Sequence, residues 1–115
     1  MGYLSKIGHG MYIEVNGNSF WDIIHLERYE YSGGTLSRAG YGPMYEISGN
    51  IIRKTFGGPI LEISGSIIRQ TFGGPIAEIS GNMIRMMYGS YEYECVGVND
   101  EQLICLIAIL FGGDL

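Results

Sequence analysis

The chain has 115 residues, enough for one domain with its own hydrophobic core. Its formal net charge of −5, from 12 acidic and 7 basic residues, argues against a nucleic-acid polymer as main partner and against adhesion to anionic membranes. Two cysteines, Cys95 and Cys105, are too few for a disulfide scaffold or a zinc site, and we predict that both are buried thiols.

The first residues of the chain contain no apolar segment of the kind found in signal peptides. We therefore expect a cytoplasmic protein. We also expect no stable membrane insertion, because the longest apolar run, Leu103–Phe111, is far shorter than the roughly 20 residues that cross a bilayer.

The middle of the chain repeats with a period of sixteen residues, which is the signature of a repeat architecture. A glutamate and a glycine recur at this spacing. They show that the repeat continues on both sides of the three clearest copies, which are 42–57, 58–73 and 74–89. The predicted repeats within a single domain 1–115 are 10–25, 26–41, 42–57, 58–73 and 74–89, with a split repeat made of 90–97 and 1–9.

Each repeat is predicted to be a hairpin of two short strands. Gly49-Asn50 has glycine first, as a two-residue type II′ turn requires. Gly57-Gly58 is predicted to make the return turn, and Pro59 then stands at a strand start, where proline is tolerated.

These turns predict a strand register with an apolar inner face and a charged outer face. Across each turn the register pairs an apolar residue with an apolar residue and a glutamate with an arginine, which stabilises the sheet. The predicted pairs are Ile47–Ile52 and Glu46–Arg53 across Gly49-Asn50, and Ile52–Ile63 and Arg53–Glu62 across Gly57-Gly58. Asp22, Arg38 and Lys54 fall on the inward face, so we expect the alternation to break at that rim. Closure also needs stagger, so some turns should be irregular or bulged.

Twelve such strands are predicted to close into an antiparallel barrel around a central helix. The split repeat places the first strand beside the last, and closure removes the sheet edges. The helix is predicted over 100–111, with a cap at Asn99 or Asp100 and a stop at Gly112-Gly113. It is apolar on every face from Leu103 onward and must be buried. The fold class is therefore mainly β with one α-helix.

The C-terminal part resembles a known family. The segments Tyr91-Glu92-Tyr93-Glu94-Cys95-Val96 and Asn99–Ile107 look like the last strand, acidic turn and central helix of small bacterial LURP-one-like proteins. The whole architecture resembles the tubby, LURP-one-related and phospholipid-scramblase barrels, of which this chain would be a compact bacterial or phage-type member. The resemblance implies a mostly non-catalytic function. Tubby domains bind phosphoinositides through basic residues, but no matching basic cluster is present here.

No catalytic residues, metal site or cofactor are predicted, because the sequence contains no phosphate loop, zinc spacing or nucleophile motif. His9 and His25 occupy equivalent turn positions and are either two polar turn residues or ligands of a shared metal, the first being favoured. We therefore do not expect an enzyme.

Arg53, Arg69 and Arg85 form the best candidate ligand site. They are predicted to share one outer face, where guanidiniums hold phosphate groups in a bidentate manner. The alternative is a solvated salt-bridge ladder, because each arginine is predicted to have two glutamate neighbours. Trp21 and His25 depart from the repeat, and we include both as candidate ligand-binding residues. Trp21 equally fits a gap-filling role.

Two functions follow from this outer face. The first is a non-enzymatic binding module that sequesters or senses an anionic small molecule, such as a nucleotide-like signal or a phospho-headgroup. The alternative is a protein-interaction or scaffold module that uses the outer face as a homo- or hetero-oligomer interface. Apolar residues predicted on that face favour a homo-oligomer; they are Met44, Ile51, Ile60, Ile67, Ile76 and Met83.

Overall fold

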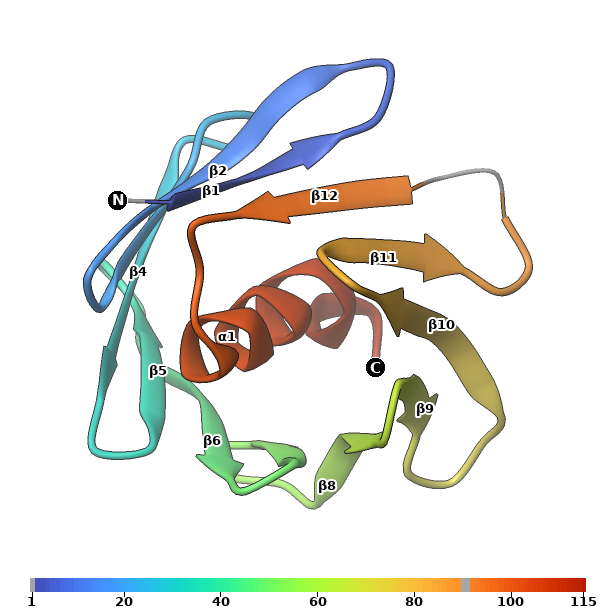
Figure 1. Cartoon of the computed structure of the whole chain (residues 1–115). Coiled ribbons are helices and arrows are strands. Elements are labelled where there is room, and N and C mark those ends of the chain that lie inside the picture. Colours follow the sequence, from blue (N-terminus) through green and yellow to red (C-terminus); the bar gives the residue numbers. More distant parts are fainter. Residues whose placement is uncertain (1, 90–91) are drawn as a thin grey trace.

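The computed structural model describes residues 2–89 and 92–115 and contains a closed antiparallel barrel of twelve strands around one helix (Figure 1). This confirms the predicted fold class. Met1 and residues 90 and 91, where the split repeat was predicted to begin, lie outside the described residues. The strands are β1 (Gly2–Lys6), β2 (Gly10–Asn16), β3 (Ser19–Asp22), β4 (Glu27–Ser32), β5 (Thr35–Arg38), β6 (Gly42–Ser48), β7 (Ile51–Lys54), β8 (Pro59–Ser64), β9 (Ile67–Gln70), β10 (Pro75–Ser80), β11 (Met83–Met86) and β12 (Glu92–Val96).

Each strand pairs with its neighbours along the chain, and β1 closes the ring by pairing with β12. Successive connections therefore lie at opposite ends of the barrel. One end, which we call the turn end, carries the two-residue turns 17–18, 33–34, 49–50, 65–66 and 81–82. The other, the loop end, carries the longer connections 7–9, 23–26, 39–41, 55–58 and 71–74, and the one that follows β11.

The turn-end hairpins have the predicted register. Glu46 pairs with Arg53 and Ile47 with Ile52 across Gly49-Asn50. Gly49 has a φ of 61°, in the left-handed region that favours glycine. Among the described residues Leu26 is the only non-glycine residue with a positive φ, so Asn50 does not share this conformation and the turn fits type II′.

At the loop end the predicted register is wrong. Strand β7 ends at Lys54, and four residues, 55–58, separate it from β8. Ile52 pairs with Leu61 instead of Ile63, and Arg53 pairs with Pro59. The connection is longer because the Gly57 N–H donates to the Lys54 carbonyl, so that a β-turn forms two residues earlier than a Gly-Gly turn would.

A β-bulge accompanies this shift and recurs around the barrel. The residue left out of the pairing is Tyr12 in β2, Met44 in β6, Ile60 in β8 and Ile76 in β10. Bulges bend a strand and increase its twist, and they provide the stagger that closure requires. The expected irregularity is therefore confirmed. Met44, Ile60 and Ile76 also pack against the core, so they do not contribute to an apolar outer face as predicted.

Helix α1 (Asp100–Phe111) has the predicted bounds, and the 3₁₀ turn η1 (Gly112–Asp114) follows it. The Asn99 side chain accepts a hydrogen bond from the Gln102 N–H, and the Gln102 side chain accepts one from the Asn99 N–H, which makes a capping box. The Gln102 Nε2 also donates to the Gly17 carbonyl at 2.9 Å, so the helix begins at the turn end. It runs through the ring to the loop end (Figure 1).

The core lies between the helix and the inward side chains of the strands. Four consecutive helix residues, 105–108, are buried, as expected for a helix that is apolar all round. Inward side chains from the strands complete one contiguous cluster, which includes Leu4, Ile13, Val15, Phe20, Leu36, Ile52, Leu61, Ile68 and Ile84. Burial of this cluster is the main source of stability, at roughly 25 cal/mol for each Å² of apolar surface removed from water.

Candidate functional site

The five predicted ligand-binding residues lie in three separate places. Arg53, Arg69 and Arg85 are exposed on the outer wall, in the alternate strands β7, β9 and β11. Trp21 lies in β3, and His25 lies in the connection between β3 and β4 at the loop end. Alternate strands are about 9.6 Å apart at the backbone, so neighbouring arginines of the outer wall can contact one extended ligand.

The three arginines differ in how far their charges are compensated. Arg85 approaches Glu92 at 3.1 Å and Glu78 at 3.8 Å, and Arg69 approaches Glu62 at 3.6 Å. The prediction that each has two glutamate neighbours is wrong for Arg69, because the bulge places Pro75 opposite it.

Arg53 has the least compensated charge of the three. The bulge places Pro59 opposite it on one side. Its partner on the other side, Glu46, accepts hydrogen bonds from Thr35 and Thr55 at 2.8 and 3.0 Å. Among the side chains of residues 2–89, 92–113 and 115, Arg53 has no ion-pair partner.

Trp21 lines a shallow hollow on the outer wall. The Arg28 guanidinium lies 5.3 Å from the centre of the indole ring, within cation–π range. The hollow has a volume of about 310 Å³ and is also lined by Glu14, Asn16 and Ser19. The arrangement presents one aromatic face that Arg28 already partly covers.

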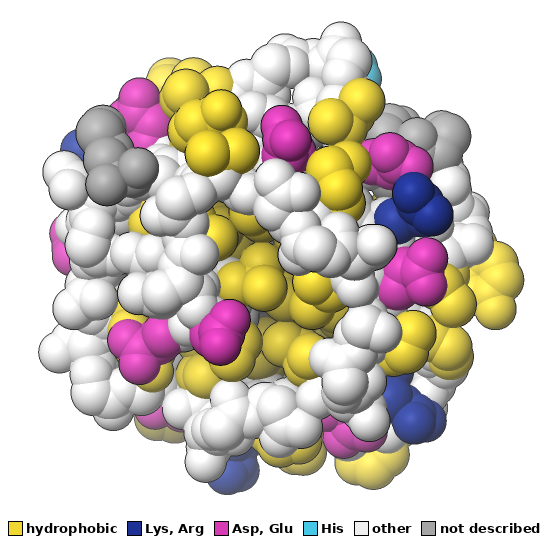
Figure 2. Space-filling model, viewed as in Figure 1, with side chains coloured by type: hydrophobic (Ala, Val, Ile, Leu, Met, Phe, Trp, Pro, Cys, Tyr) yellow, Lys and Arg dark blue, Asp and Glu magenta, His cyan; other side chains and the backbone are white. Residues whose placement is uncertain are grey.

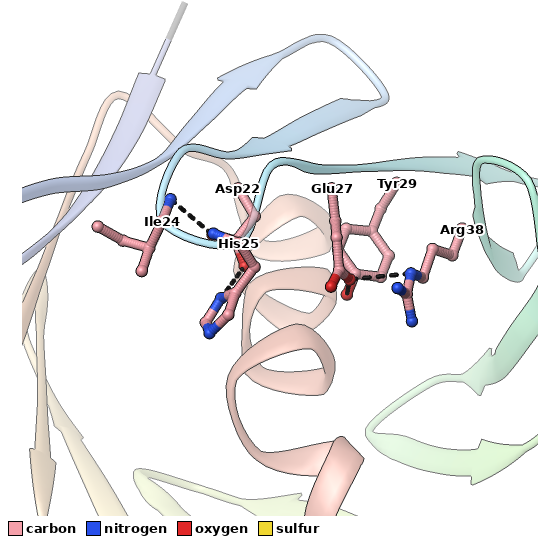
Figure 3. A network of polar contacts seen from close by, with 6 residues as sticks. All are labelled: Asp22, Ile24, His25, Glu27, Tyr29 and Arg38. Atoms are coloured by element: carbon pink, nitrogen blue, oxygen red, sulfur yellow. Dashed lines mark hydrogen bonds and ion pairs between the residues drawn. The ribbon is translucent and has the colours of Figure 1, made fainter.

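His25 belongs to a polar network at the loop end (Figure 3). Its Nδ1 lies 2.9 Å from the Asp22 Oδ2, and the Asp22 Oδ1 accepts hydrogen bonds from the Ile24 and His25 N–H groups at 3.0 and 2.9 Å. The Asp22 side chain is 5% exposed and that of His25 is 55% exposed. Asp22 is therefore a buried anchor for the whole connection, and His25 presents its other ring nitrogen outward.

A second group continues this network. The Arg38 Nε lies 2.9 Å from the Glu27 Oε2, and the Tyr29 hydroxyl donates to the same carboxylate at 2.9 Å. Burial, reinforced by Glu27, raises the pKa of Tyr29. Glu27 and Tyr29 line a hollow of about 340 Å³ together with Tyr12, Asp22, His25 and the end of α1.

Strand alternation was predicted to break at this rim, where three charged residues fall on the inward face, and the bulges of β2, β6, β8 and β10 break it there. Asp22, Arg38 and Lys54 end β3, β5 and β7 in regular pairing, opposite Ile13, Tyr29 and Tyr45. Asp22 and Arg38 have the partners given above, and the Lys54 Nζ donates to the Leu115 carbonyl. The rim accommodates the two cations because it surrounds the exit of the helix, whose carbonyl end carries partial negative charge, whereas Asp22 is held by the N–H groups of Ile24 and His25.

Neither cysteine is a candidate nucleophile. Both are free and buried, as predicted. Burial raises the pKa of Cys95 to about 11 and that of Cys105 to about 12, with smaller contributions from Glu94 and Glu101. The thiolate that nucleophilic chemistry requires is therefore scarce near neutral pH.

His9 and His25 do not form a metal site in the part of the chain that the structure describes. No group of three or more His, Cys, Asp or Glu there is placed to hold an ion. His25 instead contacts Asp22, and its ring centre lies 6.0 Å from that of Tyr12.

Sequence reasoning missed a ring of exposed apolar side chains at the loop end. We call this ring the apolar crown. Phe56 and Phe72 are the most exposed members, at 101% and 91%. The full set is Ile7, Ile24, Leu26, Tyr41, Phe56, Phe72, Met87 and Tyr88. The predicted two-residue return turn concealed it, because that turn placed Phe56 and Phe72 inside strands instead of at loop tips.

The turn end has an apolar hollow of its own, which we call the end hollow. Ile63, Ile79, Leu103 and Ile104 contribute its apolar lining, and its volume is about 350 Å³. Asp100 and the turns at Asn50, Gly65 and Gly81 form its edge. Figure 2 shows hydrophobic side chains at the bottom of the central depression of the molecule, surrounded by backbone and polar groups.

Comparison of the chain with protein-family models, with curated proteins and with solved structures gave no match. Among the described residues, α1 and η1 are the helical elements, and neither is long and apolar enough to cross a membrane.

Proposed function

We propose that this protein is a non-enzymatic binding module that sequesters or senses an anionic small molecule on its arginine-bearing outer wall. The observation that carries the proposal is that, among the side chains that the structure describes, Arg53 is the one arginine of the three without an ion pair. A guanidinium without an ion pair keeps its full capacity for bidentate hydrogen bonds to a phosphate. Arg69 lies on the same face and is about half exposed, and its one ion pair among the described side chains is with Glu62, at 3.6 Å.

The spacing of the arginines favours a ligand with more than one phosphate. Arg53 and Arg69 are separated by the single strand β8, where they lie opposite Pro59 and Glu62, so their backbones are farther apart than the roughly 9.6 Å between alternate strands. Two long flexible side chains can converge across that distance on a diphosphate, and a nucleotide-like signal has this chemistry. Exposed contacts of this kind weaken as salt screens them, so binding should be salt-dependent.

Calorimetric titration with inorganic pyrophosphate and with adenosine diphosphate at low ionic strength tests the proposal. We expect binding to the natural chain and a loss of at least tenfold in affinity for Arg53→Gln. Arg28→Gln is the matched control, because Arg28 is an exposed arginine of the same wall that stacks on Trp21. Equal affinity in the natural chain and in Arg53→Gln would overturn the assignment, as would no heat of binding with either ligand.

A second candidate function, a protein-interaction or scaffold module, has its own supporting observation. The apolar crown exposes two phenylalanines almost completely, and large exposed apolar patches mark interaction sites. We place this interface at the loop end rather than on the outer wall, because Met44, Ile60 and Ile76 pack inward. Polar replacement of Phe56 and Phe72, followed by cross-linking in cells, would test this interface. We expect the replacement to remove cross-linked products, and unchanged products would contradict the proposal.

Membership of the tubby, LURP-one-related or scramblase barrels stays a prediction. A closed barrel around an apolar helix is the architecture that the resemblance implies. The expected cytoplasmic location belongs to the same proposal, and two free, buried thiols are compatible with a reducing compartment.

A further inference from the structure

We propose that the protein associates head to tail with further copies of itself, with Phe56 and Phe72 of one copy inserted into the end hollow of the next. The inference rests on the protein-interaction candidate and gives it a partner. It does not depend on the anion-binding proposal, which concerns the outer wall.

The first argument is the exposure of the two phenylalanines. Both occupy the same place in neighbouring loops, 55–58 and 71–74, and neither side chain is buried within its own chain. Each phenylalanine buries on the order of 200 Å² when it is enclosed. The four aromatic members of the crown together expose on the order of 700 Å², close to the roughly 800 Å² that each partner contributes to a stable interface.

The second argument is that the same chain carries a matching receptor. The end hollow is lined largely by aliphatic side chains, and its volume of about 350 Å³ lies within the range of binding pockets. It lies between the first turn of α1 and the turns that follow β6, β8 and β10. The crown and the hollow are therefore at opposite ends of the barrel, so one copy can use both at once.

The third argument is charge. Asp100 and Glu101, both exposed, lie beside the end hollow at the start of α1. Lys54 is exposed at the opposite end, two residues before Phe56. A head-to-tail contact brings the exposed Lys54 of one copy toward Asp100 and Glu101 of the next.

A membrane surface is a weaker candidate for the partner of the crown. The loop-end rim balances its inward cations with Asp22 and Glu27, and the chain as a whole carries a charge of −5. Peripheral binding to anionic bilayers depends on an excess of basic residues close to the apolar contact.

Contacts between two different surfaces have a defined consequence. They do not close on themselves after two copies, so they generate rings or open filaments. The inference therefore predicts species larger than a dimer whose average mass rises with concentration.

Sedimentation velocity from micromolar to millimolar protein, combined with a complementation experiment, tests the inference. The crown variant is Phe56→Ser with Phe72→Ser, and the hollow variant is Leu103→Lys. We expect each variant alone to stay monomeric. We expect an equimolar mixture to form a one-to-one dimer and nothing larger, because only one intact crown and one intact hollow remain available to each other.

Two further variants keep the test decisive. Asp100→Lys changes the edge of the hollow without altering the core, and it replaces Leu103→Lys if that variant fails to show a cooperative thermal transition. Ile24→Ser is the matched control, because it removes an exposed apolar side chain from a loop across the ring from loop 71–74. We expect it to leave the mass distribution of the natural chain unchanged.

Three outcomes would overturn the inference. Self-association of the hollow variant alone would indicate contact between two crowns. Unchanged self-association of the crown variant would place the interface elsewhere. A natural chain that stays monomeric throughout would exclude a second copy as the partner, and sedimentation with phosphatidylcholine–phosphatidylserine vesicles would then report whether a membrane takes its place. If the natural chain stays monomeric, the head-to-tail inference fails. The protein-interaction function fails as well only if the crown substitutions leave the cross-linked products in cells unchanged.

Discussion

The two ends of the barrel are built from the same sixteen-residue pattern but differ in almost every physical respect. The turn end has two-residue turns, a capped helix start and an apolar depression. The loop end has longer connections, bulges beside them, a polar network around the buried Asp22 and exposed apolar loop tips. The geometry of a two-residue turn fixes the register of its two strands. A longer loop constrains its own side chains less, so they are free to contact other parts of the protein or a partner.

The largest effect should come from removing the element that links the two ends. We expect truncation before Asn99 to abolish cooperative folding, because α1 contributes the buried centre of the core. Circular dichroism during a thermal melt would measure this. Replacement of Leu115 by Ala, at the far end of the same segment, is the milder comparison. A soluble truncated chain with a cooperative transition would contradict the central role of the helix.

At the loop end, Asp22→Ala should destabilise the protein by about 2–3 kcal/mol. The change leaves the Ile24 and His25 N–H groups without their acceptor in a partly buried loop. Chemical denaturation would give the free energy of unfolding. Asp22→Asn keeps one acceptor oxygen and should cost less. If the two variants were equally stable, the hydrogen bonds to the carboxylate oxygen would not be the reason for its burial.

Alkaline pH should weaken the core through the two thiols. Below about pH 8.5 neither state ionises them, so they contribute no pH dependence. Above it, Cys95 and Cys105 ionise in the unfolded chain, whereas burial keeps the pKa of the folded thiols at about 11 and about 12. Stability should therefore fall as pH rises through this window, by about 1–2 kcal/mol for each thiol at pH 10.

The matched measurement is the free energy of unfolding of Cys105→Ala relative to the natural chain between pH 7 and pH 10. We expect the difference between the two proteins to shrink as pH rises, because the variant lacks the thiol that opposes folding. A constant difference would contradict this account.

At the turn end, Asn99→Ala should cost about 1 kcal/mol, the usual effect of losing a helix N-cap. It removes the acceptor for the Gln102 N–H, which is exposed enough for water to replace part of the bond. Thermal denaturation of Asn99→Ala and of Asp22→Ala under the same conditions would compare the two losses of stability. A larger loss for Asn99→Ala than for Asp22→Ala would reverse the comparison between the ends.

The smallest effect should be a gain in stability at the loop end. Leu26 has a φ of 56°, in the conformation that a branched side chain adopts only with strain. Gly10 and Gly42 occupy the equivalent positions with positive φ. We expect Leu26→Gly to stabilise the fold by about 0.5–1 kcal/mol, measured by chemical denaturation, with Leu26→Ala as the control that keeps the strain. No gain over Leu26→Ala would show that the backbone strain is absent.

Part of the candidate site could be predicted from the sequence. The positions of Arg53, Arg69 and Arg85 on alternate strands follow from the sixteen-residue spacing. The positions of the bulges could not be predicted, and they decide which arginine keeps a glutamate opposite it. Met44, Ile60 and Ile76 look like outward residues by strict alternation, but the extra residue of each bulge lets them contact the core.

The sequence by itself determined the helix, the strand pairs joined by glycine-led turns and the closure of the ring. Each of these depends on interactions between residues close in sequence, or on an apolar pattern strong enough to allow one solution. Only the tertiary structure decided the loop-end register, the burial of Asp22 beside His25 and the exposure of Phe56. Those features depend on the stagger needed to close twelve strands around a helix, and that requirement belongs to the barrel as a whole.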